Sequence, residues 1–120
     1  MLLLLLLGLL LLGGCASTVE PETYRVHLSG VADQAIEITE DAARTGDTDK
    51  LAEKARLLAR SLGGVRPPRD YEQQHERALE ALDLLERGAR APESEGVWDV
   101  WSGVAKLYDL RYELARSESP

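Results

Sequence analysis

The fold class is decided by residues 24–42, which read YRVHLSGVADQAIEITEDA. Apolar residues recur in this stretch at alternating spacings of four and three, the period of one face of an α-helix. The pattern predicts an amphipathic helix from about Glu22 to Arg44, and Gly46 is suited to end it. Its apolar stripe consists of Tyr24, Leu28, Val31, Ala35, Ile38 and Ala42.

Three further segments show helical periodicity, and no alternation of apolar and polar residues lasts long enough to predict a strand. Asp47 or Thr48 is suited to cap a second helix, which the Gly63-Gly64 pair ends. A third helix follows the loop of residues 65–68, and a fourth covers about residues 95–116. Because short connections favour antiparallel neighbours, the sequence predicts an all-α fold, a small up-and-down antiparallel bundle of about four helices.

The fourth predicted helix differs from the others because its apolar residues wrap more than one face. Such a helix either is the most buried of the bundle or presents a face to a partner. Trp98 and Trp101 lie three residues apart and share a face of this helix. We expect both to pack in the core, since aromatic side chains bury large areas. The alternative is an exposed aromatic anchor for a partner.

The N-terminal segment is almost pure leucine: residues 2–12 contain ten Leu and one Gly. A bilayer requires about 20 apolar residues, so this block is short for a transmembrane helix and fits the apolar part of a signal peptide. The run Leu12-Gly13-Gly14-Cys15 resembles the lipobox of bacterial lipoproteins. The resemblance implies that the signal peptide is cleaved before Cys15, that the Cys15 thiol receives a diacylglyceryl group, and that the freed amine is usually acylated too. Two or more acyl chains anchor a protein stably.

Other interpretations of the N-terminus stay open. No Lys or Arg precedes the leucine block, whereas a signal peptide normally begins with a basic segment. Either the true start lies upstream, or the α-amino group is the only positive charge. The small residues Gly14 and Ala16 also suit ordinary cleavage after Ala16, which would release a soluble protein. An uncleaved apolar anchor is the third alternative. Where sorting depends on the residue after the lipidated cysteine, Ala16 favours the outer membrane.

The predicted organisation is a lipoprotein signal peptide at residues 1–14, a lipidated cysteine and short tether at 15–22, and a helical bundle domain at 23–120. Residues 16–22 reach at most about 25 Å when extended, so the domain would sit close to the membrane. All charged residues lie beyond position 14, and the formal net charge is −7. This balance and the lack of Lys and Arg clusters argue against nucleic acid as a partner. The single cysteine excludes an intramolecular disulfide.

The third predicted helix places His75 on its apolar stripe, four residues after Tyr71. A histidine there can bind a ligand or act as a general base, but a buried imidazole bonded to a neighbour is the more common case. No zinc spacing, nucleophile elbow, P-loop or dinucleotide fingerprint occurs, so we expect no metal, no cofactor and no enzymatic activity. Pro67-Pro68 followed by Tyr71, His75 and residues 78–85 also resembles small uncharacterised helical lipoproteins of bacteria, which implies the architecture alone.

Two hypotheses of function follow. The first is a membrane-anchored module of the bacterial envelope that binds another envelope protein or has a structural role. The second is a helical bundle that binds a small ligand or metal in its interior near Tyr71 and His75. A cavity beside His75 would favour the second hypothesis. An exposed patch of several hundred Å² around Trp98 and Trp101 would favour the first.

Overall fold

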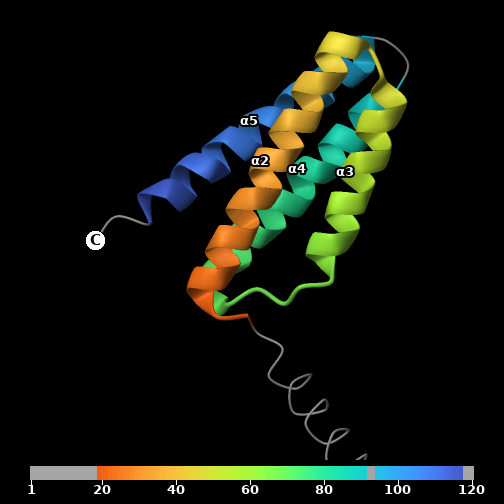
Figure 1. Ribbon diagram of the computed structural model, residues 1–120. Coiled ribbons are helices and arrows are strands. Elements are labelled where there is room, and N and C mark those ends of the chain that lie inside the picture. Colours follow the sequence, from red (N-terminus) through yellow and green to blue (C-terminus); the bar gives the residue numbers. More distant parts are fainter. Residues whose placement is uncertain (1–18, 92–93, 118–120) are drawn as a thin grey trace, which may run out of the picture.

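The computed structural model describes residues 19–91 and 94–117, which form four α-helices and no strand. Consecutive helices run antiparallel, so the predicted all-α bundle is confirmed (Figure 1). The expected signal peptide, Cys15 and the first residues of the tether lie outside the described residues. In chain order the elements are α2 (Pro21–Thr45), α3 (Thr48–Gly63), the 3-10 helix η1 (Arg69–Tyr71), α4 (Glu72–Arg90) and α5 (Ser94–Arg116).

Local sequence signals fix the ends of the helices. Proline is favoured in the first helical turn, and α2 begins at Pro21, one residue before the expected Glu22. Gly46 ends α2 with φ at +78°, a left-handed conformation that glycine adopts readily, and its N–H donates to the carbonyl of Ala42 over 2.7 Å. Asp47 caps α3 as predicted, because its carboxylate accepts the N–H of Lys50 at 3.0 Å.

The core runs along the bundle and takes one inward stripe from each helix. Burying each large apolar side chain contributes about 1.5–3 kcal/mol to stability. The stripe of α2 is rotated slightly from the prediction, because Ile36 is buried while Ile38 is only half-buried. The largest completely buried side chains are Tyr24, Leu28, Leu62, Leu82, Leu85, Leu107, Leu110 and Leu114.

Glycines allow α4 and α5 to approach backbone to backbone. A Cβ added at Gly96 would overlap the carbonyl oxygen of Gly88, and one added at Gly88 would lie 2.6 Å from the carbonyl oxygen of Gly96. Gly103 is similarly close to Ala81, whose carbonyl oxygen would lie 2.9 Å from an added Cβ. These close contacts fix one face of α5 against α4, while α5 runs obliquely across the bundle (Figure 1).

Candidate interaction surface on α5

The outer face of α5 is apolar and open to solvent. Trp98 is 75% exposed and Trp101 65% exposed, so the expectation that both pack in the core is wrong. Outside α5, the only large exposed apolar side chains of the described residues are Val26 and Leu57. We call the exposed surface of α5 the aromatic face, and it consists of Val97, Trp98, Trp101, Tyr108 and Tyr112.

The tryptophans are exposed because α5 carries two apolar faces and the core takes only one. Leu107, Leu110 and Leu114 lie on the inner face and are at most 1% exposed. Trp98 and Trp101 point away from these leucines, since residues at those spacings lie on a different side of a helix with 3.6 residues per turn. The alternative that the sequence left open, a face presented to a partner, agrees with this arrangement.

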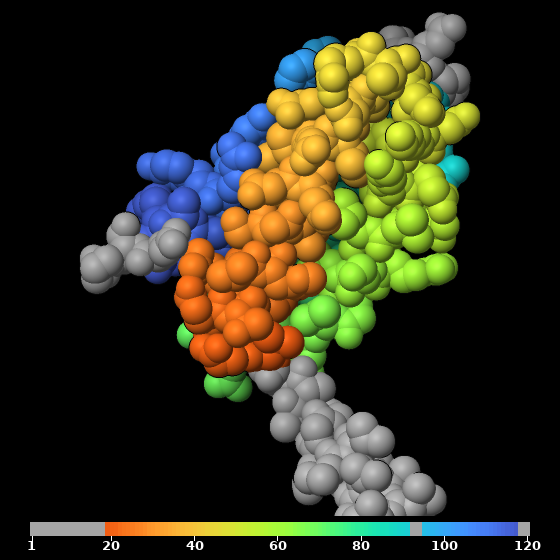
Figure 2. All heavy atoms as spheres, viewed as in Figure 1, coloured from red at the N-terminus to blue at the C-terminus, as the bar shows by residue number. Residues whose placement is uncertain are grey.

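An apolar groove runs beside the aromatic face. It has a volume of about 530 Å³ and lies among α2, α4, α5 and the start of α3. Ile36 and Ala43 belong to its α2 wall, and the polar residues of its lining are Thr39, Glu40 and Thr48. In the space-filling view, α5 emerges beside and beyond α2 (Figure 2). The α5 wall contains Gly96, Val97, Val100, Trp101, Val104 and Tyr108.

Four of the residues in the α5 wall repeat at the spacing of a coiled-coil seam. Val97, Trp101, Val104 and Tyr108 are separated by four, three and four residues. Helices that pack side by side commonly present apolar residues at this spacing. The seam covers 12 residues, or about 18 Å of helix. The groove and the seam together therefore have the form of a docking site for another helix.

Two arginines at the C-terminal end of the aromatic face contact neighbouring side chains. The Arg111 guanidinium lies 5.0 Å from the centre of the Tyr108 ring and donates to the Asp33 carboxylate at 3.2 Å. Arg116 lies 5.6 Å from the centre of the Tyr112 ring. Such cation–π contacts contribute about 0.5–1 kcal/mol at exposed sites. They favour a fixed orientation of the two tyrosine rings, so the face is preformed at this end.

Two further charged side chains of α5, Lys106 and Glu113, pair with α4. Arg77 donates to Glu113 at 2.5 Å, and the Lys106 ammonium lies 3.2 Å from the Glu80 carboxylate. Exposed pairs of this kind contribute little to stability, typically up to about 1 kcal/mol. These pairs hold the charged groups of Lys106 and Glu113 against α4, on a side of α5 other than the aromatic face.

No family model matches the chain, and no curated protein or solved structure gives a significant match. Evidence for function therefore comes from the residues themselves. Among the described residues, no helix is long and apolar enough to cross a bilayer.

The interior around Tyr71 and His75 is filled by another side chain. His75 is 7% exposed, and its Nδ1 is hydrogen-bonded to the hydroxyl of Tyr24. The Tyr24 ring lies 5.8 Å from the His75 ring and 5.7 Å from the half-buried Tyr71 ring, measured between centroids. Neither Tyr71 nor His75 lines the groove beside α5 or the two hollows between α2 and α3. This arrangement gives no support to the ligand-binding hypothesis.

Burial is the main cause of the pKa shifts of Tyr24 and His75. It raises the pKa of Tyr24 to about 12, so the hydroxyl keeps its proton at neutral pH. Burial also lowers the pKa of His75, which outweighs the opposing effect of the Glu76 carboxylate. A neutral imidazole can then accept the Tyr24 proton in a hydrogen bond. Within the described residues no group of three or more His, Cys, Asp or Glu side chains is placed to hold a metal ion.

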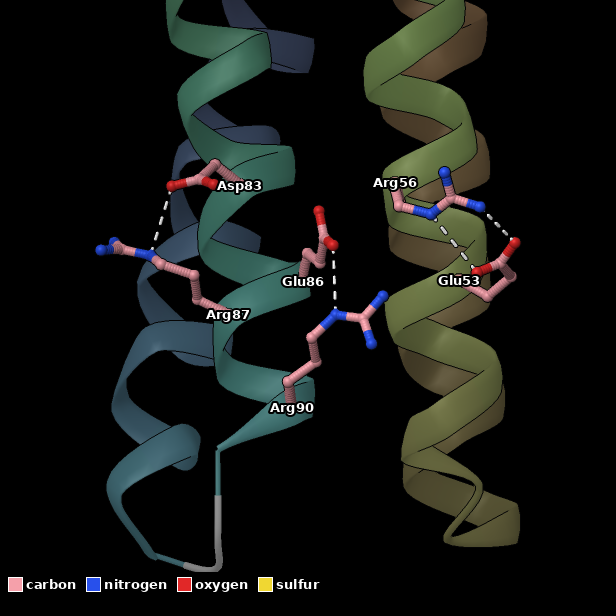
Figure 3. Close-up of polar contacts among 6 residues, drawn as sticks. All are labelled: Glu53, Arg56, Asp83, Glu86, Arg87 and Arg90. Carbon is pink, nitrogen blue, oxygen red and sulfur yellow. Dashed lines mark hydrogen bonds and ion pairs between the residues drawn. The ribbon is translucent and has the colours of Figure 1, made fainter.

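The outer surface of α3 and α4 is polar and contrasts with that of α5. Asp83 pairs with Arg87 at 3.2 Å and Glu86 with Arg90 at 3.1 Å along α4 (Figure 3). On α3, Arg56 donates to Glu53 at 2.6 Å, and this hydrogen bond is the main reason why the pKa of Glu53 is lowered. Intrahelical pairs of this kind are typical of a solvated surface.

Proposed function

We propose that this chain is a lipid-anchored module of the bacterial envelope that acts by binding protein through the aromatic face of α5. The single observation that carries the binding part is the exposure of Trp98, Trp101 and Tyr112, each at least 65%, on one side of one helix. Tryptophan and tyrosine are enriched among the residues that dominate binding energy at protein interfaces. A contiguous apolar patch larger than a few hundred Å² is rare on a monomer and marks an interaction site.

The anchor is supported by the lipobox-like run that ends at Cys15 and by the short distance from Cys15 to the domain. Only five residues separate Cys15 from Pro21, where α2 begins. The first turn of α2 would then lie within about 20 Å of the lipid headgroups. A domain held so close to the membrane meets its partner largely in two dimensions, which raises the effective concentration of each.

Lipid attachment is tested by feeding cells a clickable fatty acid and comparing the full-length chain with the Cys15→Ser variant. We expect label on the wild type, loss of the label in Cys15→Ser, and unchanged label in the matched control Ser17→Ala. The mass of the mature N-terminus should show cleavage before Cys15. Equal label in the wild type and Cys15→Ser, or cleavage after Ala16, would contradict the anchor.

Binding through the aromatic face is tested by photocrosslinking in cells. The full-length chain carries p-benzoylphenylalanine in place of Trp98 or, as a matched control, in place of Leu57, which is apolar and 48% exposed on α3. We expect a discrete protein adduct from position 98 and at least tenfold less from position 57. The same weak adducts from both positions would contradict the proposal, because the aromatic face would then have no specific occupant.

A further inference from the structure

We infer that the occupant of the groove is α5 of a second copy of this chain, so that the protein is a homodimer paired through its aromatic faces. This inference rests on the proposed function, because it names the protein that the aromatic face binds. Three properties of the described residues support it: the match between seam and groove, the available area, and the neutrality of the face.

The occupant must offer an apolar seam that is free to pack. A helix lying in the groove would contact the seam of Val97, Trp101, Val104 and Tyr108, and it needs a similar seam of its own. Within the described residues, α5 itself supplies one. The apolar stripes of α2, α3 and α4 face the core, as the complete burial of Leu28, Leu62 and Leu82 illustrates. A second α5 is therefore the one matching helix that this chain provides.

The area of the aromatic face is sufficient for a dimer. With about 150–250 Å² for each aromatic side chain, its exposed fractions correspond to on the order of 600 Å². A standard interface buries about 800 Å² on each partner. The walls of the groove lie within reach and supply further apolar surface through exposed Ala43 of α2 and half-buried Val100 and Val104 of α5. Two-fold dimers are also the most common oligomers, and each patch then meets its own copy.

The aromatic face itself is uncharged, which permits self-pairing. The whole chain carries a formal charge of −7, which repels an anionic bilayer and a second copy alike, so the charges at the contact itself decide. None of the five side chains of the aromatic face carries a carboxylate or ammonium group. The carboxylate of the groove lining is that of Glu40 in the α2 wall, and Arg111 at the edge of the face is already paired with Asp33. Two copies can therefore bring these faces together without placing like charges at the centre. Aromatic pairs across the interface add about 0.5–1.5 kcal/mol each.

The lipid anchors determine the direction of the pairing. The start of α2 and the later part of α5 both lie beside the beginning of α4, as the contacts Tyr24–Tyr71 and Arg77–Glu113 show. Two anchors can enter one bilayer only if the two copies point the same way, with the two-fold axis running along the bundles. The two α5 helices then run toward the membrane together and cross obliquely, and Trp101 and Val104 in the middle of the seam face the same residues of the second copy.

The test uses two full-length chains with different tags, co-expressed with the photocrosslinker in place of Trp98. We expect an adduct of twice the chain mass that carries both tags. Val97→Glu should reduce its yield at least tenfold, because parallel pairing sets the two new carboxylates side by side. An acidic residue near a helix N-terminus is compatible with folding, and an unchanged thermal melt checks this. Leu57→Glu on α3 is the matched control and should keep the adduct.

The outcomes separate this inference from the proposed function. An adduct of another mass with a single tag overturns the homodimer while the interaction module stands. Absence of any specific adduct overturns both. The direction is tested by Val104→Cys, which should give a disulfide-linked dimer under mild oxidation, because equivalent seam positions meet in a parallel pair. Two-tag adducts without this disulfide would overturn the parallel arrangement.

Discussion

The two faces of α5 have similar apolar character and opposite surroundings. On the inner face Leu107, Leu110 and Leu114 are at most 1% exposed, and Gly96 and Gly103 bring the helix close to α4. The outer face leaves its aromatic rings in solvent. Helix α5 therefore has more apolar surface than the four-helix bundle buries. The proposed interaction would cover this surplus.

The outer surface of α3 and α4 is the solvated, polar kind of helix face in the same molecule. There, ion pairs such as Asp83–Arg87 and Glu86–Arg90 run along each helix in solvent (Figure 3). The five side chains of the aromatic face form no ion pairs of this kind. Water solvates the ion-paired surface of α3 and α4 well, whereas contact between water and the apolar side chains of the aromatic face is unfavourable.

The largest effect on stability is expected from removing a core side chain on the inner face of α5. Leu110→Ala deletes a buried side chain in the C-terminal half of the helix and should lower the free energy of unfolding by about 2–5 kcal/mol. Tyr112→Ala, two residues later on the outer face, should lower it by no more than about 1 kcal/mol in the monomer. Chemical denaturation of both variants at low protein concentration measures the difference. Equal losses would show that the two faces do not differ as described.

A smaller loss is expected from crowding the contact between α4 and α5. Gly96→Ala places a Cβ against the carbonyl of Gly88 and should lower the free energy of unfolding by about 1–3 kcal/mol. The matched control is Gly30→Ala in α2, where nothing lies within 4 Å of an added Cβ. That change should stabilise the protein by about 0.5–1 kcal/mol, because alanine favours a helix interior. If both variants are stabilised, the close approach is absent.

The buried Tyr24–His75 pair should make stability depend on pH. The folded state lowers the pKa of His75, mainly through burial, so the unfolded chain binds this proton more readily. The free energy of unfolding should therefore fall as the pH drops below about 6.5, the pKa of an unperturbed histidine. Denaturation curves between pH 5 and pH 8, at about the limits of the histidine range, measure this fall. His75→Gln should flatten it, and an unchanged slope would contradict the assignment.

The smallest effect is expected on the ion-paired surface. Arg87→Ala removes the exposed partner of Asp83 and should change the free energy of unfolding by only about 0.2–0.5 kcal/mol. The effect should shrink further at about 1 M salt, where screening acts over about 3 Å. A loss above about 1 kcal/mol in a thermal melt would mean that this surface has a structural role that its exposure does not indicate.

The sequence predicted much of the fold because the signals are local. Periodicity located four helices, and Gly46 and Asp47 marked the junction between α2 and α3 where the structure has it. The same signals could not place Trp98 and Trp101, because a helix with two apolar faces does not indicate which one the core takes. The spacing of Val97, Trp101, Val104 and Tyr108 was the available signal for a second packing seam. The contact of Gly88 with Gly96 is tertiary, and no local pattern marks it.

Fluorescence of the two native tryptophans tests the central claim most directly, because Trp98 and Trp101 are the only tryptophans of the chain and both lie on the aromatic face. Acrylamide quenching is compared between the full-length wild type and Val97→Glu, which keeps both indoles. We predict weaker quenching and emission at shorter wavelength for the wild type, because the second copy covers its indoles. Identical quenching and emission in the two proteins, at every concentration, would contradict the account.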